Sequence, residues 1–304
     1  MTRRIAIMTE EPGWHGEVLS GAFHRRHCEA VFVSLADCSI DLDCEFGLSL
    51  PGFARALPDA VLVRGVAAGT LEQITLRLGI LHALRELEVP VYNDARAIER
   101  SVDKSMTSFL LNAARVPTLP TWVTESAEQA RRYVMRETAL GRELVIKPLF
   151  GSQGVGLKRI ASVADLPSEA EYNEVFYLQR FIDSGEGRWH DWRVFVVGHR
   201  TIAAMIRRGK DWINNVARGA AYEWAPLGED LCRLSEDATR ALDLDYAGVD
   251  IIRDAQGQAF VVEVNSMPAW AGLQEVSAID IAQTLVDDLL ARRLRRPSLD
   301  SVSL

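Results

Sequence analysis

The sequence predicts a mixed fold, α/β at the start of the chain and α+β after it. Two patterns support this prediction. Short apolar runs alternate with helical stretches over the first 95 residues, which is typical of a small parallel α/β domain. From Val145 onward, paired strands with tight turns predominate, which indicates α+β organisation. The 304 residues are 48% hydrophobic and 25% charged, as in an ordinary globular protein with a substantial core.

The first part of the chain predicts strands separated by helices. Residues 3–9, 30–35, 59–65 and 89–93 are short apolar runs of strand length. An amphipathic stretch from Glu17 to about Arg26 predicts the first helix. The second helix follows Thr70, which forms a capping box with Gln73, and it closes at Pro90.

The rest of the chain predicts helices first and hairpins after them. A helix is expected over residues 101–115, capped by Ser101 or Asp103, and another begins at Ser126 and stops at Gly141. Two hairpins follow, one turning at residues 198–200 and one at residues 254–257. A last helix is expected from about residue 277 to residue 295.

Charge and cysteine usage narrow the class of protein. With 34 Lys and Arg against 42 Asp and Glu, the net charge of −8 argues against nucleic acid or an anionic membrane as partner. The N-terminal apolar run is too short for a signal peptide and no transmembrane run is present, so we expect a cytoplasmic protein. The four cysteines lack C-x-x-C spacing, which favours free, mostly buried thiols.

Three oxygen-bearing side chains converge in the second predicted hairpin. Glu263 and Asn265 project to one side of their strand because side chains alternate, and Asp250 on the partner strand can join them. Carboxylate and amide oxygens suit a hard cation such as Mg²⁺. The alternative is a structural ion pair between these carboxylates and an arginine.

A glycine-rich segment, "VIKPLFGSQGVGLKRI" at residues 145–160, predicts an anion site. Lys147 lies in a buried-looking strand and needs a negative partner, while the glycines let backbone N–H groups approach a phosphate. Lys104, in the first turn of a helix, is explained by a nearby anion or by a solvated surface position. Gln179, in the apolar strand "YLQRFI", is of a type that lines an adenine pocket.

The order of these motifs resembles a known family. "SVDKSMTSFLL", "VIKPLFGSQGVG", "LQRFI", "DWRVFVVG", "AAMIRR", "NNVARGA", "YAGVDIIRD" and "VVEVNSMPAW" together look like the ATP-grasp ligases of the RimK-like branch, over about residues 95–295. The resemblance implies an N-terminal Rossmann-like pre-ATP-grasp domain followed by a two-lobed ATP-grasp fold. The implied parts are residues 1–95, a small lobe at 96–185 with the glycine-rich loop, a C-terminal lobe at 186–297 with the metal site, and a tail at 298–304.

The resemblance also implies roles for individual residues. Two Mg²⁺ ions, with Mn²⁺ as an alternative, would be held by Asp250, Glu263 and Asn265, with Glu263 bridging them. Catalysis would use Arg207 at the transferring phosphoryl group, and Arg193, Asn215 and Arg218 at the substrate carboxylate. ATP would be bound by Lys104, Lys147, Gly151, Ser152, Gln153, Gly154, Gln179, Arg180, Phe181, Ile182 and, near the ribose or the mouth of the site, Asp191.

The implied activity is an ATP-dependent carboxylate-amine ligation through an acyl phosphate. L-glutamate is the expected incoming amino acid, and the acceptor is a protein C-terminus, a pterin or furan cofactor or a small amine. Relatives commonly form dimers or tetramers, so a homo-oligomer is expected. Two alternatives stay open, a non-catalytic ATP-binding regulatory protein and an ATP-grasp ligase that does not use glutamate.

Two departures from the family pattern and one N-terminal feature qualify these expectations. Relatives commonly read Gln-Glu-Phe-Ile where this chain has "QRFI", so the contact made by Arg180 is in doubt. The loop near residues 211–213 is also shorter than in the ribosomal-protein ligase. Trp14, His15 and Arg64 are candidates for the acceptor site because ligands of α/β sheets gather at the carboxyl ends of strands. Packing at the domain junction is the alternative for Trp14.

Overall fold

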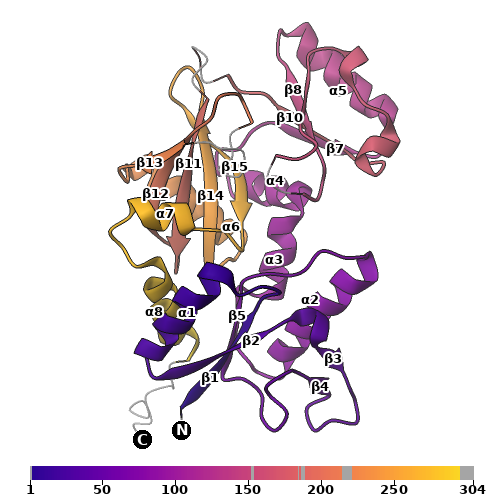
Figure 1. The fold of residues 1–304 in the computed structure, drawn as a ribbon. Coiled ribbons are helices and arrows are strands. Elements are labelled where there is room, and N and C mark those ends of the chain that lie inside the picture. Colours follow the sequence, from indigo (N-terminus) through magenta and orange to yellow (C-terminus); the bar gives the residue numbers. More distant parts are fainter. Residues whose placement is uncertain (1, 152–153, 184, 186–188, 214–220, 295–304) are drawn as a thin grey trace, which may run out of the picture. The chain divides into compact units, whose positions relative to one another are not determined.

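The computed structural model of the chain describes residues 2–151, 154–183, 185, 189–213 and 221–294. The chain divides into two compact units (Figure 1). Unit 1 comprises Met1–Ile98, Met267–Gln274 and Ala278–Leu304, and unit 2 comprises Glu99–Ser266 and Glu275–Ser277. The domain boundaries expected at residues 95, 185 and 297 stay a prediction.

Unit 1 is built on a parallel four-stranded sheet, as the alternating pattern predicts. Its order is β2-β1-β5-β6, from strands β1 (Arg3–Met8), β2 (Cys28–Val33), β5 (Ala60–Val63) and β6 (Val91–Tyr92). Its longer helices are α1 (Gly13–Arg25), α2 (Leu71–Glu86) and α8 (Ile281–Arg293). Ile80, Leu81 and Leu84 of α2 pack on the sheet in one buried cluster, while α1 and α8 lie side by side.

Helix capping in unit 1 confirms one predicted start and corrects two others. The Thr70 hydroxyl accepts from the Gln73 N–H, and the Gln73 side chain accepts from the Thr70 N–H, so the predicted capping box is present. Helix α1 begins at Gly13 rather than Glu17. Helix α8 begins after Asp280, whose carboxylate accepts from the Gln283 N–H, and not at residue 277.

The helix expected over residues 101–115 is α4 (Lys104–Ala113), and a helix that was not predicted, α3 (Ala95–Val102), precedes it. Asp103 separates them because its backbone is extended, and its carboxylate accepts from the N–H groups of Ser105 and Met106. Asp103 is therefore the N-cap of α4, and Ser101 lies in the last turn of α3. The remaining short elements are β3 (Ser39–Ile40), β4 (Leu48–Ser49), α7 (Ala271–Val276) and the 3₁₀ turns Leu35–Asp37, Val163–Asp165 and Glu169–Tyr172.

Unit 2 contains a small antiparallel sheet covered on one face by a helix. The strands are β7 (Thr121–Thr124), β8 (Leu144–Lys147), β9 (Lys158–Ile160) and β10 (Phe176–Arg180), in the order β7-β10-β8-β9, and the helix is α5 (Ala127–Ala139). Leu144, Ile146, Phe176 and Leu178 form a buried cluster with α5. Because side chains alternate along a strand, Lys147 and Gln179 point to the face away from α5.

A second sheet of unit 2 has five antiparallel strands. Its order is β13-β12-β11-β14-β15, from β11 (His190–Val197), β12 (Arg200–Arg208), β13 (Ala221–Trp224), β14 (Tyr246–Arg253) and β15 (Ala259–Asn265), and α6 (Glu229–Ala241) packs on it. Both predicted hairpins are confirmed. Gly198 and His199 have φ values of 59° and 62°, as the tight turn between β11 and β12 requires.

The cysteines are free, as the spacing predicts, but only Cys28 and Cys38 are buried, while Cys44 is exposed and Cys232 is intermediate. Across the described residues, no helix combines the length and the apolar character that crossing a membrane requires.

Candidate active site

Charged side chains form a row across one face of the five-stranded sheet. Arg207 lies opposite Asp191, Arg193 opposite Asp250, and Asp250 opposite Glu263. Residues directly opposite each other in antiparallel strands project to the same face, and so do residues two apart in one strand. The row therefore runs from β12 through β11 and β14 to β15.

Arginines bind the central carboxylate of this row. Arg193 donates from Nη2 to Asp250 Oδ2 at 3.0 Å, and Arg207 Nη2 lies 3.1 Å from the same oxygen. Burial raises the pKa of Asp250, but Arg193 and Arg207 together outweigh burial and hold that pKa below its usual value. Asp250 is consequently a carboxylate at neutral pH.

Asp191 lies on β11 within this row, and the position near the ribose or the mouth of the site that the resemblance implies stays a prediction. Its side chain is buried and forms a two-point ion pair with Arg207, which is itself 5% exposed. A planar guanidinium held at two points has a fixed orientation. Asp191 thus fixes the direction in which Arg207 points.

Asp250, Glu263 and Asn265 fit a hard cation. Asn265 donates from Nδ2 to the Gly248 carbonyl, which leaves its Oδ1 as a ligand atom on the strand that carries Glu263. A register shift lies beside the Asp250 and Glu263 pair. Within the described part of the chain, no three His, Cys, Asp or Glu side chains are grouped to hold a metal, so a cation here takes the amide as its third protein ligand and further ligands from phosphate or water.

The two carboxylates differ in their ion pairs, and metal binding by either of them stays a prediction. Asp250 pairs with two arginines, whereas Glu263 has no Lys or Arg within 4 Å among the residues that the structure describes. A half-buried carboxylate without a cation favours a cation from outside the chain.

Lys147 is a half-buried cation that lacks a carboxylate partner among the described residues. Its ammonium donates to Gln179 Oε1 at 2.6 Å, and no carboxylate of the described chain lies within 4 Å of it. Burial lowers the pKa of Lys147 to about 8, against the attraction of Glu263 and Asp250. The site thus holds a desolvated positive charge that an anionic ligand would compensate.

Gln179 positions Lys147 rather than presenting its side chain to a base. It is 1% exposed, and its Nε2 donates to Thr121 Oγ1 and to Tyr177 Oη while its Oε1 holds Lys147. The side-chain amide of Gln179 is thus used within the protein, and the predicted adenine pocket, formed by backbone groups and apolar contacts of this strand, stays a prediction. Tyr177 was missed from the sequence, although its place two residues before Gln179 sets it on the same face.

Lys104 holds the start of the glycine-rich loop. Its ammonium donates to the carbonyls of Leu149 and Gly151 at 3.2 and 2.9 Å, and burial lowers its pKa. Gly154 has a φ of 69° and Gly156 one of 74°, and a Cβ on Gly156 would meet Pro148 Cγ at 2.7 Å. The loop conformation therefore requires glycine. The predicted loop residues Ser152 and Gln153 lie outside the described residues.

Arg180 points away from Lys147. It shares the α5 side of β10 with Phe176 and Leu178, and it donates from Nε and Nη2 to Glu137 Oε2 at 3.1 and 2.7 Å. The arginine that departs from the family pattern thus pairs with a buried carboxylate of α5, and its contact with the nucleotide stays a prediction. Phe181 and Ile182 follow it, with the Phe181 ring near Trp189 and Trp212. The predicted residues Asn215 and Arg218 lie outside the described residues.

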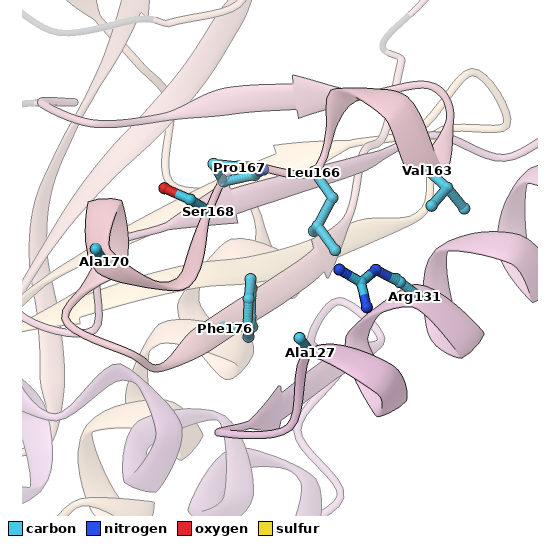
Figure 2. A pocket seen from close by; sticks show the side chains of 8 residues that line it. All are labelled: Ala127, Arg131, Val163, Leu166, Pro167, Ser168, Ala170 and Phe176. Carbon is cyan, nitrogen blue, oxygen red and sulfur yellow. The ribbon is translucent and has the colours of Figure 1, made fainter.

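A separate pocket lies on the α5 side of the small sheet (Figure 2). It has a volume of about 460 Å³, and its floor is Phe176, with Arg131 and Leu166 approaching each other across it. The remaining lining residues are Ala127, Val163, Pro167, Ser168 and Ala170. Because it opens on the face opposite Lys147 and Gln179, this pocket is not the anion site.

Comparison with known proteins agrees with this geometry. A family model for the RimK-like ATP-grasp domain matches residues 101–289. The chain is 31% identical over 293 residues to a tetrahydromethanopterin:alpha-L-glutamate ligase of Methanococcus maripaludis, covering 94% of this chain and 98% of that protein. It is 31% identical over 214 residues to a ribosomal protein bS6--L-glutamate ligase of Escherichia fergusonii, covering 67% and 69%.

The fold is shared with a solved ligase. The ATP-grasp ligase PsnB, in complex with a phosphomimetic variant of its minimal precursor, Mg and ADP, superimposes with a TM-score of 0.73 at 20% identity, over 96% of this chain and 99% of that one. The family model covers more than half of the chain, and the Methanococcus relative covers nearly all of it. The chain therefore belongs to the RimK-like ATP-grasp family and is an ATP-using ligase.

Proposed function

We propose that the protein joins L-glutamate to the carboxylate of an acceptor, and that the row Arg207, Asp191, Arg193, Asp250 and Glu263 is its catalytic face. The observation that supports this most strongly is the row itself together with Lys147. Lys147 is a desolvated cation without a carboxylate partner, Arg207 is fixed in direction by Asp191, and Glu263 is a carboxylate without a cation partner among the described residues. Mg²⁺ and ATP would supply the missing charges.

The reaction has two steps. An acceptor carboxylate oxygen attacks the γ-phosphorus of ATP, a new P–O bond forms, and the bond to the β-phosphate oxygen breaks to release ADP. The neutral amine of glutamate then attacks the acyl carbon, the C–O bond to phosphate breaks, and the amine loses a proton as the amide forms. Neither step requires a covalent nucleophile from the protein.

The residues of the site act by position and charge. Arg207, held by Asp191, would neutralise charge that develops on the transferring phosphoryl group. Lys147, positioned by Gln179, would bind a terminal phosphate, and Lys104 would hold the loop that covers it. Arg193, whose guanidinium already binds one carboxylate, would orient the carboxylate of the substrate.

Asp250, Glu263 and Asn265 would hold Mg²⁺, for which we propose two ions. When bound, the metal neutralises the phosphate charge and keeps the phosphates in line with the attacking oxygen. The fixed part of this arrangement is the register that places Asp250 opposite Glu263.

Glutamate is proposed because the relatives named for a methanopterin cofactor and for a ribosomal protein both ligate it. The acceptors in those two names differ, so an experiment has to identify the acceptor of this chain. A pterin cofactor is the first candidate, because the similarity to the Methanococcus ligase extends over nearly the full length of both chains. A homo-oligomer, dimeric or tetrameric, stays part of the proposal.

The test is ADP release by the purified protein with Mg-ATP and L-glutamate, against protein C-terminal peptides, pterin cofactors and small amines. We expect ADP only when glutamate and one acceptor class are both present, and a product mass increased by one glutamyl residue. ADP release that ignores glutamate but requires another amine would replace glutamate. Tight ATP binding without ADP release from any combination would favour a regulatory protein.

A further inference from the structure

Unit 1 has a cluster of aromatic and cationic side chains at the carboxyl edge of its parallel sheet. Arg64 directly follows β5, and its N–H donates to the Met8 carbonyl at the end of the neighbouring strand β1. Trp14 and His15 lie in the first turn of α1, which begins five residues after Met8. The carboxyl edge of a parallel sheet is where ligands of α/β domains bind.

Among the described residues, Arg64 has no carboxylate partner, unlike two other arginines of unit 1. It donates to the Pro268 carbonyl at 3.1 Å and lies over the Trp270 ring at 4.6 Å. Its Nε is buried without a hydrogen-bond partner, and no carboxylate of the described chain lies within 4 Å. By contrast, Arg25 and Arg26 of the same unit pair with Asp280 and Asp287. An unsatisfied buried donor on a cation favours an anionic ligand.

His15 is a neutral donor beside Arg64. Its Nε2 accepts from the backbone N–H of Trp270 at 3.0 Å, so the proton of the neutral ring lies on Nδ1. Burial and, to a smaller extent, the charge of Arg64 together lower the pKa of His15 to about 4, so the ring stays neutral at physiological pH. The first turn of α1 adds backbone donors, because Pro12 provides no side-chain cap and no acidic residue lies in that turn.

The acidic residues of the adjoining loop do not neutralise Arg64. Glu10 accepts from the Ser34 hydroxyl at 2.7 Å, and Glu11 is exposed. Neither carboxylate lies within 4 Å of the Arg64 guanidinium. The positive charge is therefore available to a ligand.

Aromatic rings flank this positive charge. Trp14 is 41% exposed, and its ring meets His15 edge-on at a centroid distance of 5.0 Å. Trp270, which Arg64 covers, is buried and meets His15 at 4.5 Å. An exposed indole next to a fixed cation suits a ligand with a flat conjugated ring and an anionic group.

We propose that Arg64, His15 and Trp14 bind the acceptor of the ligation, and that this acceptor has an anionic group, carboxylate or phosphate, besides the carboxylate that reacts, together with a flat conjugated ring. This inference rests on the proposed function.

The test uses the full chain and two matched pairs of probes. Pterin-6-carboxylate and pterin differ only in the carboxylate, and riboflavin 5′-phosphate and riboflavin differ only in the phosphate. Calorimetry should show at least tenfold tighter binding of the anionic member of one pair, and the pair that shows it identifies the anion. Equal binding, or none, within both pairs would overturn the inference.

Variants assign the binding to the cluster. Arg64→Met should reduce the affinity of the anionic probe to that of its neutral partner, and Trp14→Leu, at an exposed position, should weaken both members of the pair equally. Arg25→Met, which removes a paired arginine of the same unit, should change neither. Anionic preference that survives Arg64→Met, with wild-type unfolding temperature, would contradict the assignment.

Nucleotide binding separates this inference from the proposed function. Arg64→Met should bind Mg-ATP as the wild type does, while its acceptor KM rises. If the wild type forms no ADP with any acceptor, the proposed ligation fails whatever the probes show. If ADP forms and the probes do not bind through Arg64, only the acceptor site is wrong.

Discussion

Replacing Lys147 with methionine should abolish nucleotide binding and yet stabilise the free protein. The ammonium of Lys147 is desolvated and has only the Gln179 amide as partner among the described residues. A charge held in that environment opposes folding. Methionine fills a similar volume without the charge. The substitution should therefore increase the free energy of unfolding while removing the cation that binds nucleotide.

The magnitude follows from the pKa. A fall from the ordinary value of 10.5 to about 8 corresponds to about 3 kcal/mol of unfavourable free energy in the folded state below pH 8. Leaving Gln179 Oε1 without its donor costs about 1–2 kcal/mol. The variant should therefore be more stable by about 1–2 kcal/mol at pH 7.

The lowered pKa of Lys147 determines how the stability difference between wild type and variant changes with pH. Between about pH 8 and pH 10.5 the unfolded chain keeps the Lys147 proton that the folded chain has lost, so the stability of the wild type rises relative to the variant. The advantage of Lys147→Met should be complete at pH 7 and nearly gone at pH 10.

Urea unfolding at pH 7 and pH 10 measures this difference directly. Lys158→Met is the matched control, because Lys158 lies in the same sheet, is exposed, and has a pKa raised by its hydrogen bond to Glu171. The control should gain no stability at pH 7. A destabilised Lys147→Met, or a gain that is the same at both pH values, would refute the description of Lys147 as a desolvated cation.

Three further substitutions test other parts of the site. Glu263→Gln should reduce ADP formation by at least 100-fold while circular dichroism stays unchanged, and turnover within a few-fold of wild type would exclude Glu263 as a metal ligand. Gly156→Ala should weaken Mg-ATP binding at least tenfold, because the new Cβ meets Pro148, and equal affinity by calorimetry would show that the loop tolerates the change. Glu137→Gln should lower the free energy of unfolding by about 1–3 kcal/mol, because Arg180 loses a buried charged partner, and an unchanged urea midpoint would contradict that pairing.

Much of the fold is readable from the sequence where the signal is local. The Thr70 capping box, the turn at residues 198–199 and the two hairpins each depend on a few neighbouring residues, and all are confirmed. The residues at which helices begin and end are harder to predict from neighbouring residues alone. Asp103 interrupts a continuous helical pattern by capping one helix just after another ends, and either Ser101 or Asp103 fits the cap from sequence alone.

For the candidate site, too, the sequence predicts the features that depend on local patterns but not those that depend on tertiary contacts. Strand alternation places Asp250, Glu263 and Asn265 on one face, and the register of β14 and β15 agrees. The roles of Gln179 and Arg180 depend on tertiary partners. Only the packing of β10 between β7 and β8 shows that Gln179 holds Lys147, and only the position of α5 shows that Glu137 binds Arg180.

The central claim is that an acceptor carboxylate is phosphorylated by ATP before glutamate adds. An acceptor labelled with ¹⁸O in its reacting carboxylate, incubated with Mg-ATP and L-glutamate, tests it most directly by mass spectrometry of the inorganic phosphate. With both carboxylate oxygens labelled, we predict one ¹⁸O in each phosphate released, and at least 100-fold less labelled phosphate when Glu263→Gln replaces the wild type. Amide formation with unlabelled phosphate would contradict the acyl-phosphate reaction.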